Sequence, residues 1–148
     1  TEIYTLSLHD ALPILKGAVF VAQVSLPFLL QQKNGCIILI SSIWGETGGA
    51  YEVLYSAVKG AQNALTKSLA KELAPSGITV NAVSPGAIKT NMLIQQLDGE
   101  DLDFLSSQIP MKRLGEPEEV ASLVRYLSSE EANYITGQVI RASGGWDG

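Results

Sequence analysis

The sequence predicts an α/β fold in which parallel strands alternate with helices. Short apolar runs alternate along the chain with longer helical segments, and glycine, proline or small polar residues separate them. The short runs are continuously apolar, as expected for strands that are covered on both faces. The order helix, strand, helix, strand, helix, strand favours right-handed crossovers. A chain of 148 residues can form one such domain with a hydrophobic core.

The first two elements are a largely apolar helix over residues 15–32 and a strand over residues 36–41. The helix is expected to end at the basic turn and glycine of residues 33–35. Pro27 should kink or weaken it, because proline removes a backbone hydrogen bond. A Gly-rich loop follows the strand at residues 45–49.

A long helix over residues 52–73 and a strand over residues 78–83 come next, separated by the helix-stopping segment 74–77. An irregular polar stretch then reaches residue 115. Within it, we expect partial helix over residues 92–108.

The last two elements are a helix over residues 117–127 and a strand over residues 137–141. Pro117 suits the first position of a helix, and Glu118 and Glu119 favour its N-terminus electrostatically. No linker or repeat interrupts the pattern, so we expect one α/β unit.

Residues 1–14 carry no clear helical or strand period. They resemble the translation of a sequencing adapter, so we expect a non-native or disordered leader; an irregular native N-terminus is the alternative. The folded domain is accordingly expected over residues 15–148.

The composition favours a soluble, cytoplasmic protein. The net charge is −5 and the ten basic residues are scattered, which argues against a nucleic-acid surface. The longest apolar segment, residues 18–30, is interrupted by polar residues and proline and falls short of the roughly 18 residues that span a bilayer. We expect neither nucleic acid nor membrane as a partner.

The single cysteine and the single histidine limit the chemistry further. Cys36 cannot form an internal disulfide, and its apolar neighbours indicate a small buried hydrophobe rather than a nucleophile. Zinc sites made from Cys and His need several such ligands, so no metal site is expected. His9 is the sole candidate for a Ser-His-Asp relay, and we do not assign it that role.

Tyr55 and Lys59 carry the strongest chemical signal. A spacing of four residues places them one turn apart on the same helical face. A free phenol has a pKa of about 10, and an ammonium within ~4–6 Å typically lowers it by about 1–3 units. The pair therefore suits proton transfer at neutral pH.

Ser42 is the third member of this candidate group. It follows the first strand, at the carboxyl edge of the sheet where ligands bind in open α/β folds. Taken singly, a Tyr-x-x-x-Lys pair is usually a surface contact and a serine before a loop is usually a turn former. The three residues together, on strand, loop and helix, indicate a catalytic site.

Four segments resemble successive motifs of the short-chain dehydrogenase/reductase family: residues 40–45 (ISSIWG), 55–60 (YSAVKG), 81–86 (NAVSPG) and 134–137 (YITG). The resemblance covers about residues 15–146. It is greatest to the 3-oxoacyl-acyl-carrier-protein reductases and, within them, to reductases of the 5-aminopentanone group on elongation factor P. It implies the C-terminal part of a Rossmann-like, doubly wound parallel sheet whose N-terminal half is missing.

The resemblance also implies roles for individual residues. Ser42 would orient the substrate carbonyl, Tyr55 would be the general acid, and Lys59 would lower the Tyr55 pKa and bind the nicotinamide ribose. The cofactor contacts would be completed by Pro85, Gly86, Ile88 and Thr90, and the stretch after Thr90 would be a mobile substrate lid. Trp44 and Glu52 are further candidates for substrate contact.

Two departures from the family pattern concern the cofactor. The family's Gly-x-x-x-Gly-x-Gly turn has no counterpart here, and its active-site Asn position is occupied by Ile14. We attribute the first to a missing N-terminal half and the second to the junction between the non-native leader and the domain. The isolated chain is therefore expected to be inactive or insoluble, with an unpaired edge on the strand over residues 36–41.

Three functions remain open: reduction of 3-oxoacyl thioesters on acyl carrier protein, reduction of a carbonyl on elongation factor P, or a non-enzymatic assembly module. Retention of the Ser-Tyr-Lys group counts against the third. The cofactor would be NADP(H) or NAD(H), with NADP(H) preferred. By resemblance the intact protein would be a homo-oligomer, a dimer or tetramer, and a small-residue stripe at residues 57–64 is compatible with that.

Overall fold

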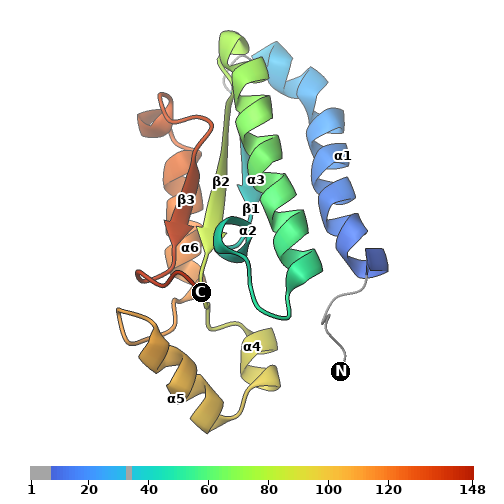
Figure 1. Cartoon of the computed structure of the whole chain (residues 1–148). Coiled ribbons are helices and arrows are strands. Elements are labelled where there is room, and N and C mark those ends of the chain that lie inside the picture. The colour runs from blue at the N-terminus through green and yellow to red at the C-terminus, as the bar shows by residue number, and fades with distance from the viewer. Residues whose placement is uncertain (1–7, 33–34) are drawn as a thin grey trace.

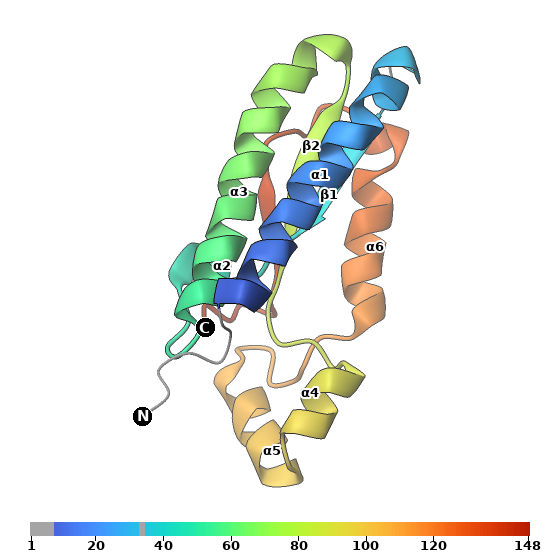
Figure 2. The same cartoon turned by 90° about the vertical axis from the view of Figure 1, so that its right-hand side faces the viewer.

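The computed structural model describes residues 8–32 and 35–148 and shows three layers, a parallel sheet between helices (Figures 1 and 2). The strands are β1 (Cys36–Ile40), β2 (Thr79–Pro85) and β3 (Val139–Ala142), in the order β1-β2-β3. The layers beside them contain α1 (Leu8–Gln32), α3 (Val53–Leu73) and α6 (Pro117–Leu127). The predicted α/β class with a parallel sheet is confirmed.

β2 is the central strand, and every residue from Thr79 to Ser84 is buried. It pairs in parallel with β1 from Cys36↔Thr79 onward and with β3 from Ala82↔Val139 onward. The buried Asn81 side chain adds a link: its Nδ2 donates to the Ile135 carbonyl at 2.7 Å, and its Oδ1 accepts from the Gln138 N–H at 3.1 Å. These bonds attach the chain before β3 to the centre of the sheet.

Each face of the sheet has its own apolar cluster. Under α3, Ala70, Leu73, Ile78 and Val80 pack with leucines of α1. On the opposite face, Val83 packs against α6 through Leu127. The continuous apolar strands are thus covered on both sides, as the sequence predicts.

The first helix begins at Leu8, seven residues before the predicted start, so the expectation of irregular structure is wrong for residues 8–14. Ala11 is fully buried, and Ala18 and Ala22 continue its row at helical spacing, which explains why the helix extends backward. The remainder of the expected leader, residues 1–7, lies outside the described residues.

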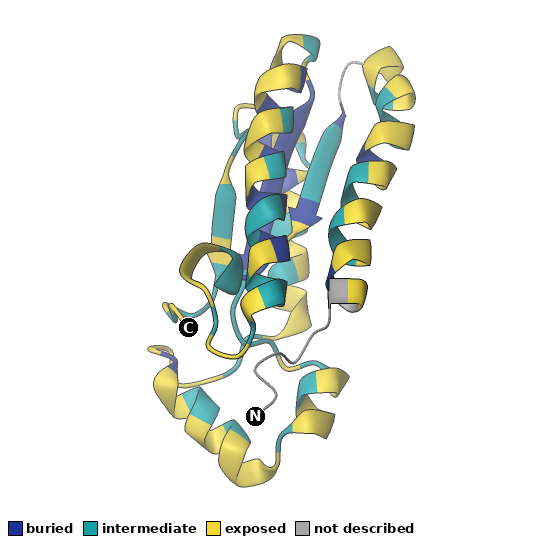
Figure 3. Ribbon diagram, turned by 45° about the vertical axis from the view of Figure 1, so that its right-hand side comes forward, coloured by how far each residue is buried: buried dark blue, intermediate teal, exposed yellow. Residues whose placement is uncertain are grey.

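The outer face of α1 is exposed (yellow in Figure 3), and it carries large apolar side chains. Phe20, Val24 and Phe28, four residues apart, are each more than half exposed. The stretch Ala11–Gln32 has a mean hydropathy of 1.6, long and apolar enough to cross a bilayer, which differs from the sequence expectation that no segment reaches that length. In the described fold α1 lies beside α3 in one layer (Figure 2), and most of the stretch Ala11–Gln32 is not buried.

β1 forms one edge of the described sheet, as expected. Beside it, α1 and β1 enclose an apolar hollow of about 280 Å³ that includes Cys36, Ile37 and Leu39. Cys36 is half-buried and opens the strand, in keeping with its predicted role as a small hydrophobe.

Several boundaries differ from the sequence prediction. The Gly-rich loop contains a four-residue helix, α2 (Trp44–Thr47), and β2 extends to Pro85. The polar stretch forms α4 (Asn91–Gln96) and α5 (Gly99–Gln108), which project beyond the carboxyl ends of the strands (Figure 1). Short 3₁₀ turns, η1 (Ala74–Ser76) and η2 (Glu130–Ala132), follow α3 and α6.

Candidate active site

Ser42 lies just beyond β1, at the carboxyl edge of the sheet. The backbone there is held by two bonds to β2: the Ser41 N–H donates to the Val83 carbonyl at 2.7 Å, and the Ile43 N–H donates to the Pro85 carbonyl at 3.1 Å. Ser42 itself is 9% exposed. Its hydroxyl is therefore fixed by the sheet rather than by a free loop.

The first turn of α3 brings Tyr55 to Ser42. The Ser42 hydroxyl interacts with the Tyr55 phenol and lowers its pKa, and Ser42 Oγ accepts from the Trp44 N–H at 3.3 Å. The rings of Trp44 and Tyr55 meet edge to face, with centroids 6.2 Å apart and planes at 87°. Ser42, Trp44 and Tyr55, which are close in sequence, therefore form one group of neighbouring side chains.

Burial raises the pKa of the Tyr55 phenol above its ordinary value of 10.0, and the nearby Glu52 carboxylate raises it further. The interaction with Ser42 acts in the opposite direction but is outweighed. The expectation that Lys59 sets a lowered Tyr55 pKa is therefore not met in this structure. Tyr55 holds its proton more firmly than a free tyrosine does.

The position of the Lys59 ammonium explains why the Tyr55 pKa is not lowered as expected. Its Nζ donates to the Ile40 carbonyl at 2.8 Å and lies 5.5 Å from the centroid of the Tyr55 ring. The residue is 9% exposed, and burial lowers the pKa of its ammonium. The spacing predicted the shared helical face correctly, but the ammonium faces the ring and a backbone carbonyl.

α2 sits directly against α3. A Cβ on Gly45 would lie 2.7 Å from the backbone carbonyl carbon of Lys59, so only glycine allows this approach. The Asn63 Nδ2 donates to the Gly45 carbonyl at 3.1 Å. Gly45 thus allows α2 to pack closely against α3 beside Lys59.

The residues expected at the nicotinamide end follow β2. Gly86 donates its N–H to the Ala142 carbonyl at 3.0 Å, and a Cβ there would lie 2.9 Å from Ser143 Cα. Ile88 pairs with Gly115, and Thr90 caps α4 by accepting from the Leu93 N–H at 3.3 Å.

Pro85 is tied to the segment after β1, because its carbonyl accepts from the Ile43 N–H. Within residues 8–32 and 35–148, no hydrogen bond joins Gly86, Ile88 or Thr90 to Tyr55 or Lys59.

The two candidate substrate residues differ in their surroundings. Trp44 is half-buried, with Gly49 and the C-terminal Gly148 close to its indole, so it forms a fixed wall beside Tyr55. Glu52 precedes the first residue of α3 and is half-buried. Its charge reaches the Tyr55 phenol, whose pKa it raises.

Sequence reasoning missed a polar chain beside this site. Glu46 Oε1 accepts from the Ser84 hydroxyl at 2.8 Å and from the Arg141 Nε at 3.1 Å, and Arg141 Nη1 also donates to Asp147. We call these four residues the Glu46 bridge. Arg141 is 95 residues from Glu46 in sequence, so no local pattern indicates the pair.

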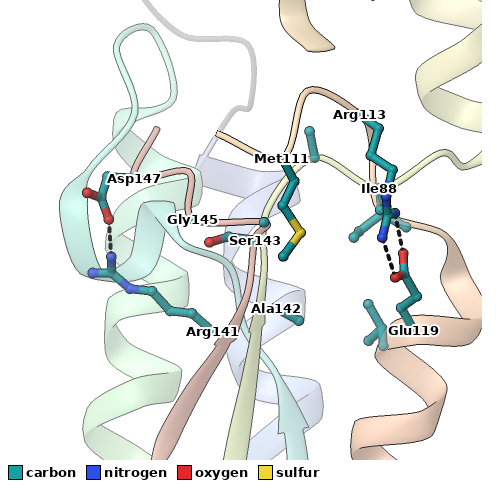
Figure 4. Close-up of a pocket in the computed structure, with 13 residues that line it drawn as sticks. Ile88, Met111, Arg113, Glu119, Arg141, Ala142, Ser143, Gly145 and Asp147 are labelled. Carbon is teal, nitrogen blue, oxygen red and sulfur yellow. Dashed lines mark hydrogen bonds and ion pairs between the residues drawn. The ribbon is translucent and has the colours of Figure 1, made fainter. Parts of the chain in front are cut away.

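An open pocket of about 530 Å³ lies beside the bridge (Figure 4). Its charged side chains are already paired: Arg141 with Asp147, and Arg113 with Glu119 through two bonds of 2.7 Å. Ile88 and Met111 provide apolar lining. The pocket therefore offers apolar surface and paired charges rather than a free ionic group.

A family model described as enoyl-(acyl carrier protein) reductase matches residues 12–147. The chain belongs to the short-chain dehydrogenase/reductase family. The match begins at residue 12, within the segment that the sequence assigned to a leader.

Curated relatives agree with this family. The "uncharacterized oxidoreductase YmfI" of Bacillus subtilis is 53% identical over 121 residues, which are 82% of this chain and 50% of that protein. The 3-oxoacyl-[acyl-carrier-protein] reductase FabG of Aquifex aeolicus is 48% identical over 131 residues, or 88% of this chain and 52% of that one. This dehydrogenase/reductase chain spans about half the length of the curated relatives it matches.

Solved structures agree as well. A 3-oxoacyl-[acyl-carrier protein] reductase of Brucella melitensis has a TM-score of 0.89 and 32% identity, covering 97% of this chain and 55% of that one. ElxO, solved with NADP bound, has a TM-score of 0.88 and 36% identity, covering 96% and 60%. The Rossmann-like part of the short-chain dehydrogenase/reductase fold is thus established for this chain.

Proposed function

We propose that this chain is the catalytic half of an NAD(P)H-dependent reductase that converts a ketone to an alcohol. One observation carries the proposal: the Tyr55 phenol interacts with Ser42, its ring packs edge to face on Trp44, and the Lys59 ammonium lies 5.5 Å from the ring centroid. A reduction needs an acid that is protonated at neutral pH and lies next to a second donor. Tyr55 and Ser42 meet both needs.

In this mechanism, Ser42 and Tyr55 both donate to the carbonyl oxygen of the substrate. Tyr55 transfers its proton to that oxygen as negative charge develops on it. Lys59 then favours the phenolate, because an ammonium near the ring stabilises the charged form. Trp44 limits the space beside the phenol and helps to exclude water.

The residues of this half fit the nicotinamide end of the cofactor. A lysine ammonium and a tyrosine hydroxyl one turn apart are suitable donors for ribose hydroxyls, and Gly86 packs so closely on Ser143 that a Cβ would lie 2.9 Å from the Ser143 Cα. The reduced nicotinamide supplies the hydride when bound. Solved relatives carry NADP or NAD, and we propose NADP(H) for this protein.

We propose a 3-oxoacyl thioester on acyl carrier protein as the substrate, on the basis of similarity to reductases of that name. The second candidate is a carbonyl compound with a cationic amine, such as the 5-aminopentanone group on elongation factor P. Glu52 favours it specifically, because a carboxylate whose charge reaches Tyr55 can also attract an ammonium near the reacting carbonyl. Either substrate agrees with a cytoplasmic enzyme.

The test is a hybrid reductase in which residues 15–148 follow the N-terminal half of the B. subtilis oxidoreductase. We expect it to oxidise NADPH in the presence of acetoacetyl thioester, and we expect Tyr55→Phe to abolish that oxidation. Higher kcat/KM on an aminoketone would select the second substrate class. A hybrid that binds NADPH but reduces neither class would contradict the proposal and support the assembly module.

We further propose that the 148-residue chain alone has no turnover. Most of the affinity for a dinucleotide normally comes from a Gly-rich turn at a helix N-terminus, and this sequence contains no such turn after a strand. The apolar edge of β1 also favours aggregation of the isolated chain. Micromolar binding of NADPH by the pure chain, measured by calorimetry, would contradict this.

For the intact protein we propose a homo-oligomer that pairs through α1 and α3. The exposed Phe20, Val24 and Phe28 supply an apolar stripe that needs cover. On α3, Ala57 and Ala64 are exposed, whereas Gly60 faces Gly45 within the chain. A monomeric mass of the hybrid in light scattering would contradict the proposal.

A further inference from the structure

The Glu46 bridge joins four segments that are distant in sequence. Glu46 belongs to α2, Ser84 is the penultimate residue of the central strand β2, Arg141 lies on β3, and Asp147 belongs to the C-terminal tail. Oε1 of Glu46 is the shared acceptor, at 2.8 Å from the Ser84 hydroxyl and 3.1 Å from Arg141 Nε.

The Glu46 bridge includes a buried partner and charged hydrogen bonds. Ser84 is fully buried, and among the described residues its hydroxyl donates to Glu46. Hydrogen bonds that involve a charged partner are shorter and stronger than neutral ones. The Glu46 carboxylate also raises the pKa of the Arg141 guanidinium, through the hydrogen bond and through charge attraction.

α2 depends on such contacts because it cannot hold its own position. It has four residues and no side-chain cap at its N-terminus, and helices this short are not stable in isolation. Gly45 and Asn63 hold α2 against α3 on one side. Glu46 holds it to the sheet on the other side.

The same short helix carries part of the site. Trp44, its first residue, donates its N–H to Ser42 and places its ring on Tyr55. Any movement of α2 relative to the sheet therefore changes the surroundings of both the serine and the phenol. Ser84 also directly precedes Pro85, the segment expected at the nicotinamide end.

We propose that Glu46 is a positioning residue for this active site. Its carboxylate, bound by Ser84 and Arg141, fixes α2 between the sheet and α3 and thereby sets the Trp44 ring against Tyr55 and Ser42. The catalytic consequence rests on the proposed reductase function; the positioning of Tyr55 does not.

The first test uses the hybrid reductase, in which the N-terminal half covers β1, and needs no activity. The ring carbons of the tyrosines are labelled with ¹³C, and the NMR signal of Tyr55 is assigned as the one that disappears in Tyr55→Phe. The Trp44→Leu variant then gives the chemical shift of Tyr55 without the ring current of the indole. We expect Glu46→Ala to move the Tyr55 signal toward the Trp44→Leu position and Glu46→Gln, which keeps the acceptor oxygen, to restore it largely. Arg113→Gln is the matched control, since it removes a paired guanidinium from the same pocket without contact to α2. An unchanged Tyr55 signal in Glu46→Ala would overturn the proposal.

The second test measures turnover by the same variants of the hybrid reductase. Because a 1 Å misplacement can cost about a hundredfold in rate, we expect Glu46→Ala to lower kcat by about 10- to 100-fold while KM for NADPH stays within about twofold. Glu46→Gln should recover most of kcat. Equal losses in Glu46→Ala and Arg113→Gln would show a general stability effect and overturn the proposal. A wild-type hybrid without turnover would count against the proposed function alone, because the Tyr55 signal still decides the positioning.

Discussion

The Lys59 ammonium lies 5.5 Å from the centre of the Tyr55 ring and donates its 2.8 Å hydrogen bond to the Ile40 carbonyl. The lysine thus links the last residue of β1 to the catalytic helix, in addition to its electrostatic effect. Burial keeps the phenol protonated, and the ammonium is placed to stabilise the charge that appears when the proton leaves.

Tyr55→Phe is expected to lower kcat of the hybrid reductase by about 10²- to 10⁴-fold, the usual contribution of a positioned acid. The ring and its packing on Trp44 are retained, so the loss should appear without a change in unfolding midpoint. Steady-state NADPH oxidation and urea denaturation measure the two effects. Tyr134→Phe, on a fully exposed tyrosine, is the control and should leave both unchanged. Retained activity in Tyr55→Phe would exclude it as the acid.

Glu52→Gln is expected to shift the pH profile of reduction. The Glu52 carboxylate raises the Tyr55 pKa because a negative neighbour disfavours the phenolate. Removing that charge lowers the pKa, so the alkaline loss of activity should begin at lower pH than in the wild type. The pH dependence of kcat measures this, with Glu72→Gln at the far end of α3 as the control. A shift to higher pH would contradict the assigned sign.

Gly45→Ala is expected to destabilise the chain, because the new Cβ would lie 2.7 Å from backbone atoms of Lys59 and α2 must move away from α3. Overpacking of this kind typically costs about 1–3 kcal/mol of unfolding free energy. Urea denaturation monitored by circular dichroism is the measurement. Gly99→Ala, where the Cβ would meet nothing within 4 Å, should be neutral. Equal stability of the two variants would show that α2 and α3 are not in close contact.

Glu119→Gln is expected to reduce the loss of unfolding free energy that occurs as the pH falls. Two bonds from Arg113 and one from the Glu116 N–H lower the Glu119 pKa to about 2. A carboxyl with a lowered folded-state pKa adds stability above its unfolded value of about 4.3, and that stability is lost as the pH falls toward 2. Urea denaturation between pH 5 and pH 2 should show a smaller decline in the variant. Glu118→Gln, one residue away, should decline like the wild type.

Local patterns predicted the parts of the fold that depend on local residues. Neighbouring residues determine the apolar runs at β1 and β2, the end of α3 after Leu73 and the start of α6 at Pro117. The structure has these elements within a few residues of the predicted bounds. The backward extension of α1 to Leu8 was missed because its repeat rests on small alanines, which give a weak apolar signal.

The site was predictable to the same extent. The four-residue spacing of Tyr55 and Lys59 predicted that they share one helical face. The position of Ser42 directly after β1 predicted that it lies at the carboxyl edge of the sheet. The direction of the Tyr55 pKa was not predictable, because burial and the position of the Lys59 Nζ are set by tertiary packing. The Glu46–Arg141 bond was not predictable either, since it joins residues 95 positions apart.

Ser42, Tyr55 and Lys59 all lie on a single stretch of β1, α2 and α3. Contacts over short chain separations close with little loss of entropy, so we expect this group to assemble early in folding, and the Arg141 bond to Glu46 to close late. A gene segment of that size can be exchanged between genes with its acid and its partners intact. The chemistry could then be inherited as one unit, while recombination supplies a different nucleotide-binding half.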